Sequence, residues 1–75
     1  MNRQQILEAI KSLAASQGFY GRLYNALTNG TEEAEEALET LERQNFADVV
    51  DMVLWLECWA TTNPVSIIIN TLINF

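Results

Sequence analysis

The residues of this sequence that could do covalent chemistry are few, and none is spaced as part of a catalytic group. Cys58 is the only cysteine in the 75 residues, and the chain contains no histidine. A cysteine nucleophile normally needs a neighbouring base such as histidine, so we expect Cys58 to be a buried, unreactive thiol. A single cysteine also excludes an internal disulfide, and one thiol among scattered carboxylates does not make a zinc site.

The carboxylates suggest a second kind of chemistry, general acid and base catalysis, but their spacing assembles no pair. Asp51 and Glu57 are the only charged residues of an apolar stretch, and nothing in the sequence brings them together. The glutamates of residues 31–43 lack the alternating oxygen ligands and central glycine of a calcium loop. A glycine-rich phosphate loop is also absent. The sequence therefore predicts a protein that is not an enzyme.

The net charge of −6 limits the kinds of partner that the chain can bind. Binding to nucleic acid phosphates needs clustered cations, and the chain has only four Lys and Arg, so we expect no direct contact with nucleic acid. Residues 31–43 contain six glutamates, which either imitate a phosphate backbone or, as is more usual for a run of charges, keep the protein soluble. The predicted acidic face consists of Glu32, Glu35, Glu36 and Glu39.

Residues 58–75 carry no charge, which raises the question of a membrane segment. Eight Thr, Asn, Ser and Pro residues interrupt this stretch, whereas a span needs about 20 mainly apolar residues. The N-terminal residues also lack the apolar run and cleavage pattern of a secretory signal. We therefore expect no contact with a membrane, and a cytoplasmic location in which the thiol is reduced.

Hydrophobic spacing predicts an all-α protein, built as one small domain of four to five short helices. A good capping residue precedes three of the stretches: Asn2, Thr31 and Asp48. Residues 1–60 are expected to form the core helices, and residues 61–75 an apolar tail. The first predicted helix runs from its cap to about residue 15. The other three are expected over residues 17–28, from 32 to about 44, and over 49–60.

The tail, residues 65–75, fits two patterns. As a helix it places Ser66, Asn70 and Asn74 in one narrow polar row, and as a strand it places strong β-formers on one face. A lone strand has no partner in a helical chain except in a symmetric dimer, so a helix is favoured. Asn63 is expected to cap this helix, with Pro64 in its first turn.

Residues 16–24 combine three aromatics, two glycines and one cation. Ser16 is expected to cap the second helix, and Gly18 to form its junction with the first. The spacing places Phe19 and Leu23 in the core. Three residues of the segment remain as a candidate interaction surface, because Tyr and Arg are frequent in interface hot spots: Tyr20, Arg22 and Tyr24. The simplest alternative role for Arg22 is an ion pair with the acidic third helix.

The stretch 49–60 is apolar around nearly its whole circumference as a helix. Such a helix is normally buried, but a chain of this size has little mass with which to cover it. Trp55 and Trp59 lie four residues apart and together present a large apolar surface. We expect them in an interface with a second copy or another protein, in preference to the alternative of an intramolecular core.

Two runs carry a resemblance to a known family: residues 10–23, IKSLAASQGFYGRL, and residues 44–53, QNFADVVDMV. Over roughly residues 1–58 the chain resembles short uncharacterised proteins from bacteriophages and mobile elements of gut Firmicutes. That family has no established activity, so the resemblance assigns no functional residue. It implies a mobile-element origin, in which small acidic proteins are often host-directed binders, including inhibitors of bacterial defence systems, or homo-oligomeric regulators.

Together these observations favour a non-enzymatic protein-protein interaction module of phage or mobile-element origin, which forms a homo-oligomer and most simply a homodimer. The alternative is an acidic inhibitor of a host nucleic-acid-binding defence protein, of the anti-CRISPR or anti-restriction type. The expected partners are proteins, either further copies of the chain or a host protein. We expect no cofactor and no metal ion.

Overall fold

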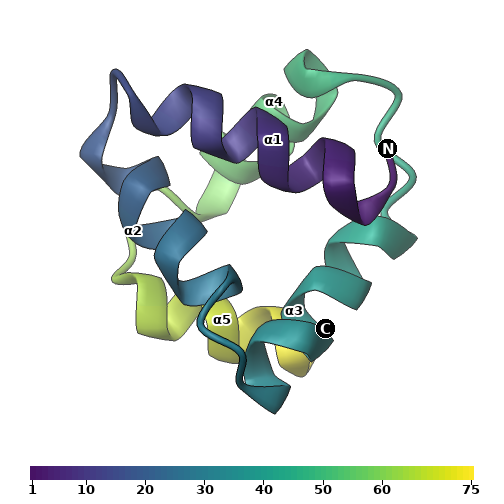
Figure 1. Ribbon diagram of the computed structural model, residues 1–75, viewed down its shortest axis with the longest axis vertical. Helices are drawn as coiled ribbons and strands as arrows, with labels where there is room; N and C mark the ends of the chain where they lie inside the picture. The colour runs from purple at the N-terminus through teal and green to yellow at the C-terminus, as the bar shows by residue number, and fades with distance from the viewer.

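The computed structural model describes residues 1–75 as five α-helices and no strand (Figure 1). The helices are α1 (Arg3–Ala14), α2 (Gly18–Leu27), α3 (Glu32–Arg43), α4 (Val49–Trp59) and α5 (Val65–Ile73). The prediction of a small all-α bundle is confirmed. The tail is helical, because a helix places Ile68 and Leu72 four residues apart on one buried face. The alternative of a strand is wrong.

Four of the helices surround the core, with α1 and α5 on opposite sides and α2 and α3 packed against both (Figure 1). Helix α4 lies behind α1 in this view and belongs to none of the main pairs of packed helices. It joins the core through side chains instead. The large buried residues of the core are Ile6, Ile10, Tyr20, Leu23, Leu27, Leu38, Leu41, Phe46, Met52, Leu56, Ile68 and Leu72.

The three predicted N-caps are confirmed. Asn2 Oδ1 accepts a hydrogen bond from the Gln5 N–H at 2.9 Å, and Gln5 Oε1 accepts one from the Asn2 N–H at 2.9 Å. Thr31 Oγ1 accepts from the Ala34 N–H at 3.2 Å, and Asp48 caps α4 in the same way. Each bond satisfies a backbone donor that the helix leaves unpaired, and such a cap stabilises a helix by about 1 kcal/mol.

Two other predicted caps are wrong. The Ser16 hydroxyl donates back to the Leu13 carbonyl at 3.3 Å, because Ser16 still belongs to the turn that ends α1. Gln17 occupies the N-cap position of α2 without a side-chain bond, and Gly18 begins the helix. Asn63 likewise serves the preceding helix, since its Nδ2 donates to a carbonyl at the end of α4.

Left-handed backbone follows α2 and α3. Gly30 has φ of +80°, a conformation that glycine adopts at no steric cost, and it separates α2 from the cap of α3. Asn45 has φ of 54° directly after the last residues of α3, which is a common way for a helix to end. The predicted ends of these two helices are therefore confirmed.

Candidate functional site

Helix α4 is held at both ends by neighbouring side chains. Asp48 Oδ1 accepts a hydrogen bond from the Asp51 N–H at 2.9 Å, and Asp51 Oδ2 accepts one from the Ala47 N–H at 3.0 Å. The two carboxylates also interact favourably with the positive N-terminal end of the helix. At the other end, Asn63 Nδ2 donates to the Trp59 carbonyl at 2.7 Å. These bonds fix where α4 begins and ends.

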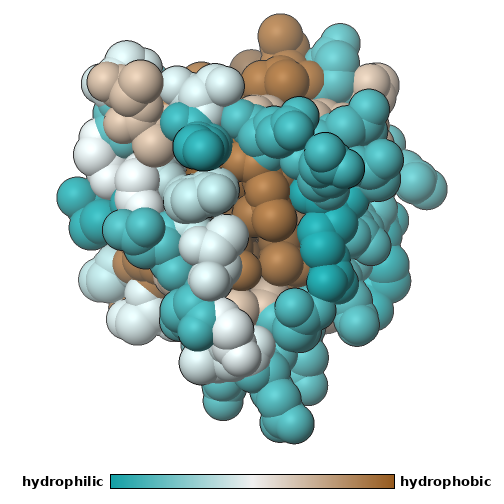
Figure 2. All heavy atoms as spheres, viewed as in Figure 1, coloured by the Kyte–Doolittle hydropathy of each residue, from teal (hydrophilic) through white to brown (hydrophobic).

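The residues between these ends divide into an inner and an outer face. Met52 and Leu56 are fully buried on the inner face. Val50, Leu54 and Cys58 recur every four residues on the outer face, and we call this row the α4 ridge. Val50 is 65% exposed, Leu54 is 59% exposed, and Cys58 is also exposed. Figure 2 shows hydrophobic residues at the top of the view, where α4 begins. The ridge is thus an apolar surface that the fold leaves in water.

Two acidic residues border the α4 ridge. At about 100° of rotation per residue, Asp51 lies on one side of Leu54 and Glu57 on the other, and both carboxylates are exposed. Residues 44–75 contain no Lys or Arg. Both ion pairs of the structure involve Arg3, which joins α1 to α3. The two border carboxylates therefore have no cationic partner within the chain.

Trp55 and Trp59 lie beside the ridge in an aromatic cluster. The two indole rings meet edge to face with centroids 5.1 Å apart. The centroid of the Trp55 ring also lies 5.5 Å from that of Phe46 and 5.6 Å from that of Phe75. Both tryptophans are half-buried against the core, whereas Phe75 is 66% exposed. The structure therefore gathers the predicted pair at the edge of the core.

Tyr20 is fully buried, so its predicted place on the surface is wrong. Helix α2 turns the row of Tyr20, Leu23 and Leu27 toward the core and leaves Phe19 half-buried. The Tyr20 ring meets Phe19 edge to face at 5.1 Å, and its hydroxyl has no hydrogen-bond partner. Burial raises the pKa of Tyr20, and the Glu57 carboxylate of α4 raises this pKa further.

Arg22 and Tyr24 do not form one surface with Tyr20. Arg22 is exposed and forms no ion pair, so its predicted pairing with α3 is wrong. Arg3 takes that role, with Nη1 bound to Glu35 and Nε 3.1 Å from Glu42 Oε1. Tyr24 is half-buried against the core. The predicted aromatic surface is therefore divided between the core and two separate positions on α2.

The predicted acidic face lies on the outer side of α3. Its members are all exposed: Glu32, Glu35, Glu36 and Glu39. Only Glu35 among them has an ion-pair partner, Arg3. Figure 2 shows hydrophilic residues covering the side of the molecule where α3 lies. The opposite side of the helix is buried and carries Ala34, Ala37, Leu38, Thr40 and Leu41.

Cys58 is exposed rather than buried, because it belongs to the outward row of α4. The chain has no histidine that could activate this thiol. The structure places no group of three or more His, Cys, Asp or Glu where they could hold a metal ion. None of the five helices has the length and apolarity needed to cross a lipid bilayer.

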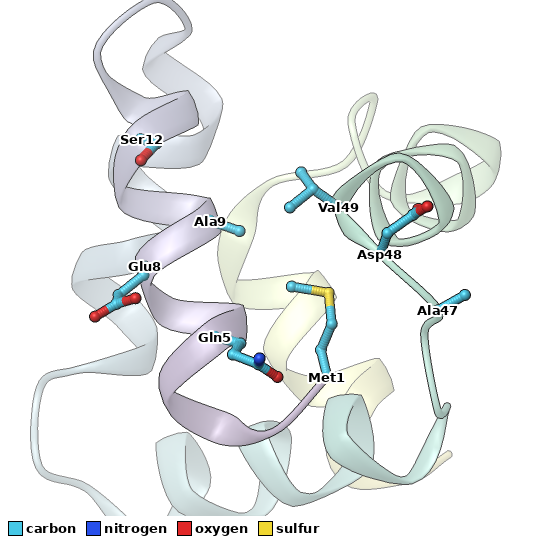
Figure 3. Close-up of a pocket in the computed structure, with 8 residues that line it drawn as sticks. All are labelled: Met1, Gln5, Glu8, Ala9, Ser12, Ala47, Asp48 and Val49. Atoms are coloured by element: carbon cyan, nitrogen blue, oxygen red, sulfur yellow. The ribbon is translucent and has the colours of Figure 1, made fainter.

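A cleft of about 470 Å³ lies between α1 and the start of α4 (Figure 3). Met1, Ala9 and Val49 point toward the space between the two helices, whereas Glu8 points away from it. Asp48 stands at the edge, where its carboxylate already accepts the bond that caps α4. The cleft thus brings together no nucleophile and base, and its lining is mixed rather than shaped for one ligand.

Val50 and Leu54 are the residues of the ridge that sequence reasoning missed as a site. The sequence pattern does not distinguish them from the other apolar residues of a helix that is apolar all round. A signal was present, because charged residues on an apolar helix mark the side that meets water. Asp51 and Glu57 both lie next to Leu54 on the helix surface, so they indicated which apolar residues remain exposed.

Comparison with known proteins does not change this description. No protein-family model, curated protein or solved structure matches the chain. The candidate site is therefore defined by the α4 ridge, its two border carboxylates and the adjoining aromatic cluster.

Proposed function

We propose that this protein is a non-enzymatic protein-interaction module and that the α4 ridge is its docking surface. The observation that carries the proposal is the exposure of Val50 and Leu54 on a helix whose opposite face completes the core. Large apolar side chains gathered on a surface are typical of interaction sites. Trp55 and Trp59 belong to the same helix and are partly exposed, and Trp is enriched among the residues that dominate binding energy.

The sequence resemblance to short proteins of bacteriophages and mobile elements supports a binder directed at the host or at itself. The sequence alone favours a homo-oligomer, most simply a homodimer, and both the origin and the oligomeric state stay predictions. The ridge can be the docking surface for a host protein or for a second copy of the chain. An apolar row on one helix is a surface that a second copy or a different protein can bury.

Site-specific photo-crosslinking in the cells that produce the protein tests this proposal. A photoreactive amino acid replaces Leu54 on the ridge and, in a matched variant, Asn25 on the exposed side of α2. We expect a discrete adduct from position 54 and little from position 25, because efficient crosslinking requires a lasting contact. An adduct with twice the mass of the chain identifies self-association, and any other mass identifies a different protein.

A second substitution serves as the control for specificity. Val50→Gln, combined with the photoreactive residue at position 54, should weaken the adduct because it removes apolar area from the same row. Val50 is exposed, so this change should leave the fold intact. An adduct from position 54 no stronger than that from position 25 would overturn the proposal.

A second candidate function is the acidic inhibitor of a host nucleic-acid-binding defence protein. The observation that favours it is the exposed row of glutamates on α3, in which Glu32, Glu36 and Glu39 have no ion-pair partner. Such a row is complementary to a groove that binds phosphates.

Charge reversal tests this second function. Changing Glu35, Glu36 and Glu39 to Lys should abolish inhibition of the defence protein. Val50→Gln should leave the inhibition unchanged, since this residue lies on α4. Inhibition that survives the charge reversal eliminates the idea.

A further inference from the structure

We propose that the α4 ridge binds a cationic amphipathic helix of another protein, whose apolar row is bordered by Lys or Arg. The inference rests on the proposed function and names the partner of the same surface. Three properties of the ridge carry it: the charge along its borders, its size and the spacing of its residues.

The borders of the ridge carry two carboxylates that form no ion pair with a Lys or Arg of the chain. Asp51 and Glu57 lie on opposite sides of Leu54, and both are exposed. Of the four cations, Arg3 is bound to two glutamates of α3, and Arg43 Nη2 donates to Thr40 Oγ1 at 3.0 Å. The other two, Lys11 and Arg22, belong to α1 and α2. A partner with cations on both sides of its apolar row would meet opposite charge on each border.

A second copy of the chain fits this surface less well. Two α4 helices that pack ridge against ridge bring only carboxylates to each border, whether they run parallel or antiparallel. No Lys or Arg of residues 44–75 can compensate, because that part of the chain has none. Like charges placed opposite one another across an interface disfavour it. The whole chain also carries a net charge of −6, so two copies repel each other as they approach.

The size of the ridge also favours a partner of opposite charge. Helix α4 has 11 residues and is therefore about 16 Å long. A stable interface buries about 800 Å² on each partner, which is more than one face of so short a helix supplies. Apolar burial alone is thus insufficient for a tight complex, and charge complementarity must contribute. This combination is typical of a transient complex with a strong dependence on salt.

The spacing of the ridge suits a helix as the binding element. Val50, Leu54 and Cys58 recur every four residues, so they form a ridge inclined by about 26° to the axis of α4. The side chains of a second helix can interdigitate with such a row along its length.

Binding of designed peptides to the full chain tests the inference. Two peptides of about four helical turns share the same row of leucines, and one has Lys and the other Glu on both borders. Fluorescence anisotropy of the labelled peptides gives the two dissociation constants at low and at high salt. We expect the Lys peptide to bind at least about tenfold more tightly at low salt, and this advantage to shrink as salt screens the charges.

Three variants separate the ridge from the overall charge. Glu57→Gln should weaken binding of the Lys peptide several-fold, whereas Glu36→Gln, which changes the net charge equally on α3, should have a much smaller effect. Leu54→Gln should abolish binding of the Lys peptide, because the apolar row is interrupted. Sedimentation of the free chain measures self-association in the same buffers.

The outcomes distinguish this inference from the proposed function. Equal affinity for both peptides, or equal effects of Glu57→Gln and Glu36→Gln, would overturn the cationic partner while crosslinking from position 54 still upheld the module. A dimer in sedimentation that Leu54→Gln converts to a monomer would also overturn it, because the occupant is then a second copy. Failure of both the peptides and the crosslinking would remove the ridge as a docking surface.

Discussion

Helices α3 and α4 have nearly the same length, 12 and 11 residues, but they meet water differently. Helix α3 turns alanines and leucines inward and glutamates outward. Helix α4 has apolar residues on both faces and exposes Val50 and Leu54. Both begin with a side-chain cap, so their positions in the chain are set in the same local way. The difference lies entirely in the outer face, which solvation explains for α3 and does not explain for α4.

The largest expected effect is a difference in stability between substitutions on the inner and outer faces of α4. Leu56→Ala should lower the free energy of unfolding by about 2–5 kcal/mol, because Leu56 is fully buried and its loss leaves a cavity. Leu54→Ala should change it by about 0.5 kcal/mol or less, since Leu54 is mostly exposed. Urea unfolding curves give both values. Equal losses at the two positions would mean that the ridge belongs to the core and is not a free surface.

The second largest effect is expected from removing the N-caps of α3 and α4. Asp48→Ala and Thr31→Ala should each lower the free energy of unfolding by about 1 kcal/mol, because each removes the acceptor for one backbone N–H. The loss should be larger for Asp48, whose negative charge also faces the positive end of α4. Thermal unfolding, with Thr31→Ser as the conservative control, measures the difference. A larger loss at Thr31 would contradict the view that both helices begin by the same mechanism.

Tyr20 tests how completely the core excludes water from a polar group. Its buried hydroxyl has no hydrogen-bond partner, so Tyr20→Phe should leave the free energy of unfolding unchanged or raise it by up to about 1 kcal/mol. The control is Tyr24→Phe, which changes a half-buried ring on the same helix. A loss of stability in Tyr20→Phe would show that the hydroxyl has a hydrogen-bond partner.

Tyr20 should also make the free energy of unfolding decrease at alkaline pH. The pKa of Tyr20 in the folded chain is raised above its ordinary value of about 10 by burial and by Glu57. The unfolded chain therefore loses this proton first as the pH rises. The contribution is fully present below about pH 10 and is lost as the pH rises through the folded pKa. Unfolding measured from neutral to alkaline pH should show this loss in the natural chain and a smaller one in Tyr20→Phe.

The smallest expected effect concerns the charges of α3. Arg3→Gln removes the bonds to Glu35 and Glu42, and should lower the free energy of unfolding by about 0.5 kcal/mol because the groups are partly exposed. Lys11→Gln is the matched control, since Lys11 is a cation of α1 without an ion pair. The difference between the two should vanish in high salt. A persistent difference would show that α3 depends on this contact for more than surface charge.

The beginnings of most helices could be predicted because their causes are local. Asn2, Thr31 and Asp48 each bond to a backbone N–H three residues ahead, so a few adjacent residues contain the whole signal. The helical tail followed from the absence of a partner strand. Ser16 and Asn63 failed as predicted caps because a polar side chain in a short turn can serve the helix on either side.

The environment of single side chains could be predicted less well, because it depends on distant elements. Whether Tyr20 or Phe19 faces inward is decided by the rotation of α2 against its neighbours. The partner of the acidic helix is Arg3, which is 32 residues from Glu35 in the sequence, and spacing along the chain does not reveal such a contact. Cys58 was expected to be buried, as unpaired cysteines usually are, and its position on the outward row of α4 decided otherwise.

The exposure of the α4 ridge has a consequence for how such a chain can evolve. Folding constrains Met52 and Leu56, whereas Val50, Leu54 and Cys58 contribute little to it. Under the proposed function, a few codon changes in the outer row can therefore alter what is bound while the protein still folds. In the proposed interaction module, this row is a place where new targets can be acquired with little loss of stability.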